Sequence, residues 1–159
     1  LKDIVFLDYP YSYLQPTLDL RKDIAREIRR TKPEILICQN PIRTLSVGRG
    51  SGHPDHIAAG ESALSAVFPT ARDRLTFPDL LEEGLEPHNV SEVWIMGTDN
   101  PDWWVDISKY MDQAIKSLEQ HTSQVSGREV AERLKDGRRR VGEPHGMEYG
   151  EAFKRLVFN

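Results

Sequence analysis

Hydrophobic and polar positions form two patterns along the first part of the chain. Short continuous apolar runs occupy Ile4–Leu7, Ile35–Cys38 and Val93–Met96. An apolar run without alternating polar positions is typical of a strand that is buried on both faces, and such strands occur mainly in parallel sheets covered by helices. Each of the three runs therefore predicts a buried strand of a parallel sheet.

Amphipathic stretches between and after these runs predict helices. Leu20, Ile24 and Ile28 recur every four residues among charged positions, which indicates an amphipathic helix that ends before Pro33. The strand, helix, strand order at the start of the chain predicts an α/β fold. Further helices are predicted at three places: one beginning near His53, one at Ile107–His121 and one in the tail near Glu151–Leu156.

Composition and charge narrow the classes of function. The chain has 159 residues, a length typical of one domain, and a formal net charge of −4. Because a nucleic-acid binder neutralises phosphates with a basic face, this charge predicts no nucleic-acid partner. Cys38 is the only cysteine, so no internal disulfide is possible and we expect a reducing, cytoplasmic location. A membrane span needs an apolar run of about 18 residues, and we expect none.

The chain begins within a predicted strand pattern, and its first residue is Leu1 rather than methionine. We interpret residues 1–159 as a single domain that is incomplete at its N-terminus, with N-terminal strands missing. A processed or trimmed terminus is the alternative interpretation.

One cluster, His53-Pro54-Asp55-His56, carries residue types suited to catalysis. It follows a predicted strand and a glycine-rich loop, and ligands of open α/β folds bind at the carboxyl ends of parallel strands. His53 and His56 are three positions apart, so they lie on one side of the first helical turn. The helix N-terminus favours neutral imidazole, the form that binds metals, and Asp55 could orient one ring. The alternative is that these residues only cap the helix and face solvent.

The cluster alone supplies too few ligands for a catalytic metal. A catalytic zinc needs three protein ligands and one open position. The other histidines, His88, His121 and His145, have no local sequence feature that supports a ligand role. Further ligands would have to be carboxylates or residues outside the chain.

Several short motifs follow one another in a characteristic order. They are Leu20-Arg21, Ile28-Arg29, Lys32-Pro33-Glu34, Gly52-His53-Pro54-Asp55-His56 with Gly60, Phe77-Pro78, Gly84-Leu85-Glu86-Pro87, Glu92-Val93, Asp106-Ile107 and His121-Thr122-Ser123-Gln124. Over residues 1–125 this order resembles the LmbE/PIG-L family of zinc-dependent N-deacetylases. The resemblance implies a Rossmann-like α/β fold, with helices on both faces of a parallel sheet.

The resemblance also implies an activity and roles for the matching residues. The family removes acetyl groups from N-acetylated amino sugars and their conjugates with one zinc ion, as N-acetylglucosaminyl-phosphatidylinositol deacetylases do. His56 would bind the zinc, His53 would stabilise the oxyanion or protonate the leaving amine, and Asp55 would hold His53 in orientation. Zinc polarises the amide carbonyl, and a nearby imidazole adds to the stabilisation of the developing charge. The expected partner is a small N-acetyl amino-sugar conjugate, and an oligomer is possible.

The chain departs from the family pattern at three places. The A-H-P-D-D-E motif that supplies the other zinc ligands and the general base does not occur. Tyr11 and Ser12 stand where an aspartate is expected, and Ala114 stands near the position expected for a lysine. We therefore expect that this chain alone neither holds zinc tightly nor deacetylates.

Other interpretations stay open. The glycine-rich stretch Gly48–Gly52 before a helix is compatible with a phosphate- or nucleotide-binding Rossmann-like domain. A truncated, non-catalytic domain is a further alternative. Trp103-Trp104 suits either a sugar platform or core packing, and the basic run Arg138–Arg140 is typical of a solvated face.

Overall fold

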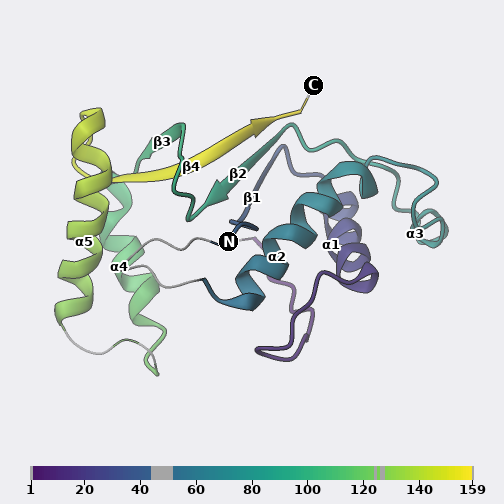
Figure 1. The fold of residues 1–159 in the computed structure, drawn as a ribbon, viewed down its shortest axis with the longest axis horizontal. Coiled ribbons are helices and arrows are strands. Elements are labelled where there is room, and N and C mark those ends of the chain that lie inside the picture. Colours follow the sequence, from purple (N-terminus) through teal and green to yellow (C-terminus); the bar gives the residue numbers. More distant parts are fainter. Residues whose placement is uncertain (1, 44–51, 124, 126–127, 159) are drawn as a thin grey trace. The chain divides into compact units, whose positions relative to one another are not determined.

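The computed structural model describes residues 2–43, 52–123, 125 and 128–158. The chain divides into two compact units, whose helices and strands are traced in Figure 1. The first unit comprises Leu1–Asp99 together with Arg155–Asn159, and the second comprises Asn100–Lys154. The predicted histidine cluster belongs to the first unit.

The first unit contains a parallel pair of strands with helices packed beside it. Its elements in chain order are α1 (Leu18–Thr31), β1 (Ile35–Gln39), α2 (Pro54–Ser65), the π-helical turn η1 (Ala66–Thr70), α3 (Asp79–Glu82) and β2 (Glu92–Met96). β1 runs parallel to β2, with Ile35 opposite Glu92 and Gln39 opposite Met96. Helices α1 and α2 lie side by side next to these strands (Figure 1). The helices predicted around Ile28 and after His53 are therefore confirmed, as are two of the predicted strands.

Local sequence determines both ends of α1. Thr17 Oγ1 accepts a hydrogen bond from the Leu20 N–H at 3.2 Å, which satisfies one of the unpaired amides of the first turn. At the other end Lys32 adopts a left-handed backbone conformation with a φ of 48°, and its N–H donates to Ile28 O at 2.9 Å. Pro33 follows and cannot continue the helix, so α1 ends where the sequence predicts.

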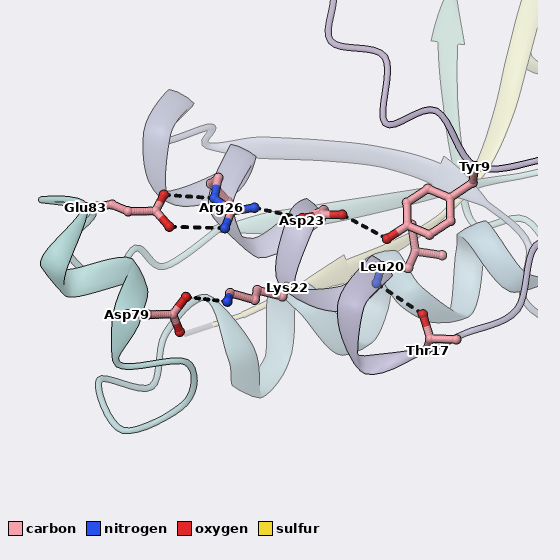
Figure 2. Close-up of polar contacts among 8 residues, drawn as sticks. All are labelled: Tyr9, Thr17, Leu20, Lys22, Asp23, Arg26, Asp79 and Glu83. Atoms are coloured by element: carbon pink, nitrogen blue, oxygen red, sulfur yellow. Dashed lines mark hydrogen bonds and ion pairs between the residues drawn. The ribbon is translucent and has the colours of Figure 1, made fainter.

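The solvent side of α1 is tied to the segment that carries α3 by charged pairs (Figure 2). Arg26 Nε and Nη2 donate to the two Glu83 carboxylate oxygens at 2.9 and 3.1 Å. Lys22 forms an ion pair with Asp79. Because these side chains are partly exposed, water screens the charges and each pair adds little to the stability of the fold. The pairs fix the position of the segment more than they stabilise the fold.

Small apolar side chains form the core of the first unit. Cys38 lies within it, and burial raises the pKa of its thiol to about 11, so this cysteine behaves as a small hydrophobic residue. The buried cluster consists of Ala25, Ile28, Cys38, Ala63, Ala66, Val67, Ala71, Leu80, Val90, Val93 and Ile95.

Arg29 is a charged residue inside this unit, with only 1% of its surface exposed. Burial lowers the pKa of its guanidinium, but an arginine remains charged in proteins. The guanidinium donates hydrogen bonds of 2.8 to 3.4 Å to the backbone carbonyl oxygens of Thr70, Ala71, Asp73, Thr76 and Leu85. The carbonyl dipoles replace water around the charge, and the irregular chain after η1 is held against α1.

Helix α2 approaches β1 closely at Gly60. A Cβ atom at this position would lie 2.4 Å from Gln39 O, a distance that no side chain can occupy. The absence of a side chain therefore lets the helix pack directly against the last residue of β1. This contact places the first turn of α2 at the carboxyl ends of the two parallel strands.

The second unit contains an antiparallel strand pair and two helices. Its elements are β3 (Trp103–Asp106), the 3-10 helix η2 (Ser108–Tyr110), α4 (Met111–Glu119), α5 (Arg128–Gly142), the 3-10 helix η3 (Glu143–His145) and β4 (Gly150–Val157), of which residues from Arg155 onward belong to the first unit. Trp103 lies opposite Phe153, and Asp106 lies opposite Gly150. A Cβ atom at Gly142 would lie 2.8 Å from Gly150 N, so these glycines let the end of α5 lie against the start of β4.

The strands form a mixed sheet of four strands in the order β1-β2-β4-β3. The predicted parallel arrangement holds for β1 and β2, whereas β3 and β4 are antiparallel. The predicted α/β class is confirmed in this coarser form. The finer Rossmann-like arrangement, with helices on both faces of a parallel sheet, stays a prediction.

The predicted strand at Ile4–Leu7 is wrong. The segment forms no strand, and Phe6 is 80% exposed. Val5 and Leu7 instead line a pocket of about 320 Å³ together with Ile24 of α1. Since no strand within the described ranges pairs with this segment, its apolar side chains rest partly on a helix and partly in solvent.

The prediction that β1 is buried on both faces is also wrong. Cys38 is buried, but Ile37 is 50% exposed, and Ile35 is exposed as well. β1 is at the edge of the four-stranded sheet, and its outer apolar side chains are left open to solvent. A continuous apolar run therefore identified the strand correctly but not the burial of its second face.

The C-terminal part of the chain differs most from its sequence prediction. The helix predicted near Glu151–Leu156 is wrong, because these residues form β4, and Phe153 lies opposite Trp103 far back in the sequence. Helix α5 was not predicted, although Val130, Leu134 and Val141 have helical spacing. The helix predicted at Ile107–His121 is confirmed over Met111–Glu119, after the 3-10 turn η2.

Two expectations concern the chain as a whole. Among the residues that the structure describes, no helix combines the length and the apolar character that crossing a membrane requires. The interpretation as a single domain that is incomplete at its N-terminus stays a prediction.

Candidate functional site

The candidate site is a pocket at the start of α2. His53 and His56 both face a cavity of about 340 Å³ at the carboxyl ends of β1 and β2. Asn40 joins these two strand ends, because its Nδ2 donates to Gly97 O at 3.3 Å. The lining residues are Gln39, Asn40, Ile42, Gly52, His53, His56, Ile57, Met96 and Gly97. The structure thus places both histidines on one side of a helix start, as the strand–loop–helix pattern predicts.

His53 is the N-cap of α2. Its backbone is extended, with φ −75° and ψ 133°, and its Nδ1 accepts a hydrogen bond from the Asp55 N–H at 3.2 Å. Pro54 follows at the first helical position, where its missing N–H costs nothing. The other ring nitrogen, Nε2, lies 3.2 Å from the hydroxyl of Tyr11. Both nitrogens of the His53 ring therefore have a partner.

The Asp55 carboxylate binds backbone N–H groups rather than the histidine ring. Its Oδ2 accepts from the Ser12 N–H at 2.7 Å, and its Oδ1 accepts from the Leu14 N–H at 3.3 Å. Oδ2 lies 3.9 Å from His53 Nδ1, which is beyond hydrogen-bond distance. The carboxylate therefore fastens the segment before α1 to the start of α2. The role expected for Asp55, to hold His53 in orientation, stays a prediction.

The segment that Asp55 binds is also fastened to α1. Tyr9 donates its hydroxyl hydrogen to Asp23 Oδ2 at 2.8 Å, and Arg26 Nη1 donates to Asp23 Oδ1 at 2.7 Å (Figure 2). Burial and the Asp23 carboxylate raise the pKa of Tyr9 to about 12, so this hydroxyl stays protonated at neutral pH. Tyr11 follows within the segment and contacts His53. Sequence reasoning noted Tyr11 only as a departure from a family pattern.

His56 is the exposed histidine of the pair. Its ring centroid lies 5.5 Å from that of His53, at an interplanar angle of 44°. Among the described residues its ring makes no hydrogen bond, so both nitrogens remain available to a ligand.

The described residues do not fit a complete zinc site. No group of three or more histidine, cysteine, aspartate or glutamate side chains within them is arranged to hold a metal ion. His53 and the neighbouring Asp55 already have other partners, which leaves His56 as a candidate ligand in the pocket. One imidazole is fewer than the three protein ligands of a catalytic zinc.

The remaining histidines are not among the residues that line this pocket. His88 Nε2 is 2.8 Å from Pro33 O, and His121 follows the end of α4. His145 stacks on Trp104 with ring centroids 3.9 Å apart, a packing role for that tryptophan. The sugar-platform interpretation of Trp103-Trp104 stays a prediction.

Two other predicted features have different outcomes. Of the glycine-rich stretch Gly48–Gly52, only Gly52 lies within the described residues, so the phosphate-binding interpretation stays untested. The basic run lies on α5, where Arg138 pairs with Glu151 at 2.7 Å and Arg139 pairs with Asp136 at 3.0 Å. These pairs are consistent with the predicted charged face.

The fold and the pocket define an α/β protein with a candidate ligand site at the carboxyl ends of parallel strands. Over 124 residues the chain is 32% identical to diacetylchitobiose deacetylase from Thermococcus kodakarensis. This alignment covers 78% of the chain and 44% of that relative. The structure of the chain is similar to that of N,N'-diacetylchitobiose deacetylase from Pyrococcus horikoshii in complex with its inhibitor MPG. That similarity has a TM-score of 0.86 and 26% identity, and it covers 99% of the chain and 58% of the other chain.

Two further solved structures share the fold. A conserved protein from Thermus thermophilus gives a TM-score of 0.74 with 27% identity, covering 96% of the chain and 65% of that protein. The 4-carboxy-2-hydroxymuconate hydratase from Pseudomonas putida gives 0.71 with 15% identity, covering 98% and 65%, and this likeness shows the fold alone. No protein-family model matches the chain. The chain spans less than half the length of the curated relative.

Proposed function

We propose that the chain carries the histidine side of the active site of an LmbE/PIG-L-type deacetylase, which hydrolyses the acetamide of an N-acetylated amino sugar or its conjugate. The observation that carries the proposal is the His53 and His56 pocket at the strand ends. It occurs in a chain whose structure is similar, with a TM-score of 0.86, to a deacetylase that acts on N,N'-diacetylchitobiose. A cavity of about 340 Å³ is large enough for a small ligand.

In the proposed reaction His53 stabilises the oxyanion or protonates the leaving amine. Hydrolysis of an amide places negative charge on the carbonyl oxygen, and the departing nitrogen needs a proton. His53 Nδ1 accepts from the Asp55 N–H, so this chemistry falls to Nε2, whose partner in the structure is the exposed Tyr11 hydroxyl. Asp55 supports the site by holding the segment of Ser12 and Leu14 against the helix start.

The resemblance to the family implies a zinc ion. Because the described residues do not complete a zinc site, we derive no catalytic step through the metal. We propose His56 as the ligand that this chain contributes, with the other ligands outside the described residues. The chain by itself should then bind no stoichiometric zinc.

The decisive assay measures acetate released from N,N'-diacetylchitobiose by the full-length gene product. His53→Asn should lower the rate by about 100-fold or more, because asparagine keeps the helix cap but cannot transfer a proton. His145→Phe is the matched control, since it replaces a histidine outside the pocket with a ring that can still stack on Trp104. A folded full-length protein that releases no acetate from any N-acetyl amino sugar would contradict the proposal.

Metal content gives a second, independent measurement. In the full-length protein His56→Ala should lose zinc, whereas His53→Asn should retain it. The opposite result would reverse the two assigned roles. Tight nucleotide binding in the absence of any metal would favour the phosphate-binding alternative instead.

A further inference from the structure

Tyr11 lies at the one ring nitrogen of His53 that helix capping leaves available. Its hydroxyl oxygen is 3.2 Å from His53 Nε2, and the ring centroids are 5.2 Å apart at a tilt of 33°. His53 Nδ1 accepts a hydrogen bond from the Asp55 N–H, also at 3.2 Å. A neutral imidazole carries one proton, so acceptance at Nδ1 places that proton on Nε2. The Nε2–H then donates to the Tyr11 hydroxyl oxygen.

The backbone on both sides of Tyr11 is fixed, although its side chain is 79% exposed. On one side, Tyr9 is bound to Asp23 of α1. On the other, the N–H groups of Ser12 and Leu14 donate to the Asp55 carboxylate. The position of the Tyr11 hydroxyl is therefore set relative to the start of α2. His53 is among the residues that line the pocket and Tyr11 is not, so the contact of Tyr11 with the pocket runs through His53.

We propose that Tyr11 is a positioning residue for His53. Its hydroxyl accepts the Nε2–H and keeps the ring in a single orientation with the Nε2-protonated tautomer. The backbone amide of Asp55 fixes the other nitrogen. The tautomer and orientation follow from the geometry, whereas any effect on rate rests on the proposed deacetylase function.

Nitrogen-15 spectra of the histidine rings test the proposal without an activity assay. The full-length protein is labelled with ¹⁵N-histidine, and the His53 signals are assigned by their loss in His53→Asn. The wild type should show His53 protonated at Nε2. Tyr11→Phe removes only the hydroxyl and leaves the hydrogen bond from the Asp55 N–H in place, so His53 should stay protonated at Nε2 while its Nε2 signal shifts because the acceptor is lost. Tyr13→Phe is the matched control, because it removes a hydroxyl from an equally exposed tyrosine, 79%, in the same segment, and it should leave the spectrum unchanged.

Two results would overturn the proposal. One is a wild-type His53 protonated at Nδ1, and the other is a Tyr11→Phe spectrum in which His53 is identical to wild type. Thermal melts of both tyrosine variants establish that they are folded.

Kinetics separate this inference from the function on which it partly rests. If the full-length protein releases acetate, Tyr11→Phe should lower kcat by about tenfold with little change in KM, because one hydrogen bond to a catalytic side chain is lost. An unchanged kcat in a variant with a shifted Nε2 signal would restrict the role of Tyr11 to structure and overturn its kinetic part. If no acetate is released but the Nε2 signal responds to Tyr11→Phe, the deacetylase proposal fails and the positioning of His53 stands.

Discussion

The guanidinium of Arg29 and the imidazole of His53 are held in place in two different ways. Arg29 is 1% exposed, and five backbone carbonyl oxygens surround its donors. His53 lies at a pocket, where one backbone N–H and one exposed tyrosine hydroxyl hold its ring. A side chain that the backbone saturates stabilises the fold and has nothing left for a ligand. A side chain held by fewer, exchangeable partners keeps its chemistry.

Replacing the buried Arg29 should have the largest effect on the stability of the fold. Arg29→Met removes a donor from five buried or part-buried carbonyl oxygens, of which Ala71 O still accepts from the His88 N–H at 2.9 Å, so we expect the free energy of unfolding to fall by about 3–5 kcal/mol. Urea denaturation followed by circular dichroism measures the change. Arg30→Met is the control, because Arg30 makes only exposed ion pairs with Asp3 and Glu27 and its loss should change stability little. Equal losses in both variants would show that the carbonyl cage contributes no special stability.

The close contact between Gly60 of α2 and Gln39 of β1 should have the next largest effect when it is disrupted. Gly60→Ala places a methyl group against Gln39 O, and we expect a loss of about 1–3 kcal/mol in the free energy of unfolding because α2 must shift. Gly137→Ala in α5 is the control, since nothing lies within 4 Å of a Cβ atom there. That variant should gain about 0.5–1 kcal/mol from the better helix propensity of alanine. If Gly60→Ala melts like the wild type, the close approach of α2 to β1 is not as the structure describes.

Two substitutions at His53 separate its structural part from its chemical part. His53→Ala removes the N-cap acceptor and should lower the free energy of unfolding by about 1 kcal/mol, whereas His53→Asn should retain the cap. Both variants lack an imidazole, so acetate release should be lost equally in the two. Paired urea melts and rate measurements check this. A stable but inactive asparagine variant is the expected outcome, and an active one would remove His53 from the reaction.

A third arginine, Arg155, should make the stability of the fold depend on pH through its pairing with Glu92. Arg155 Nε donates to Glu92 Oε2 at 2.7 Å, and hydrogen bonds from Arg155 and Trp94 lower the pKa of Glu92 from 4.5 to about 2. A carboxyl whose pKa is lowered on folding stabilises the protein above its ordinary pKa and loses that contribution as pH falls toward the folded value. The stability difference between wild type and Glu92→Gln should therefore be small but constant above about pH 5 and vanish near pH 2. Urea melts at a series of pH values measure it.

The elements around the site were predictable because their signals are local. The four-residue spacing of Leu20, Ile24 and Ile28 predicts α1, and Pro33 predicts its end. His53 and Pro54 are adjacent N-cap and first-turn residues, so the start of α2 is visible from the sequence. β1 and β2 pair in parallel, so their carboxyl ends lie together, and both histidines line the pocket at these ends.

Features that depend on distant partners were not predictable. The residues of β4 mix polar and apolar positions in a way that fits either a helix or a strand, and pairing with β3 decides between them. The five carbonyl oxygens around Arg29 come from backbone, which carries no sequence signal. The contact of Tyr11 with His53 depends on two aspartates from different helices. Asp23 of α1 binds Tyr9, and Asp55 of α2 binds the backbone of Ser12.

The Ser12 and Leu14 N–H groups donate hydrogen bonds to Asp55, which lies 43 and 41 positions further along the chain. This separation affects how readily the hydrogen bonds open. Closing a chain segment of this length costs conformational entropy that local helix contacts do not incur. Few buried apolar contacts support the segment, so it belongs to the part of the molecule that opens most readily. The Ser12 and Leu14 amide protons should therefore exchange with solvent through local opening, well before those in the middle of α1. Their exchange rates would report directly on how long Tyr11 and His53 stay together.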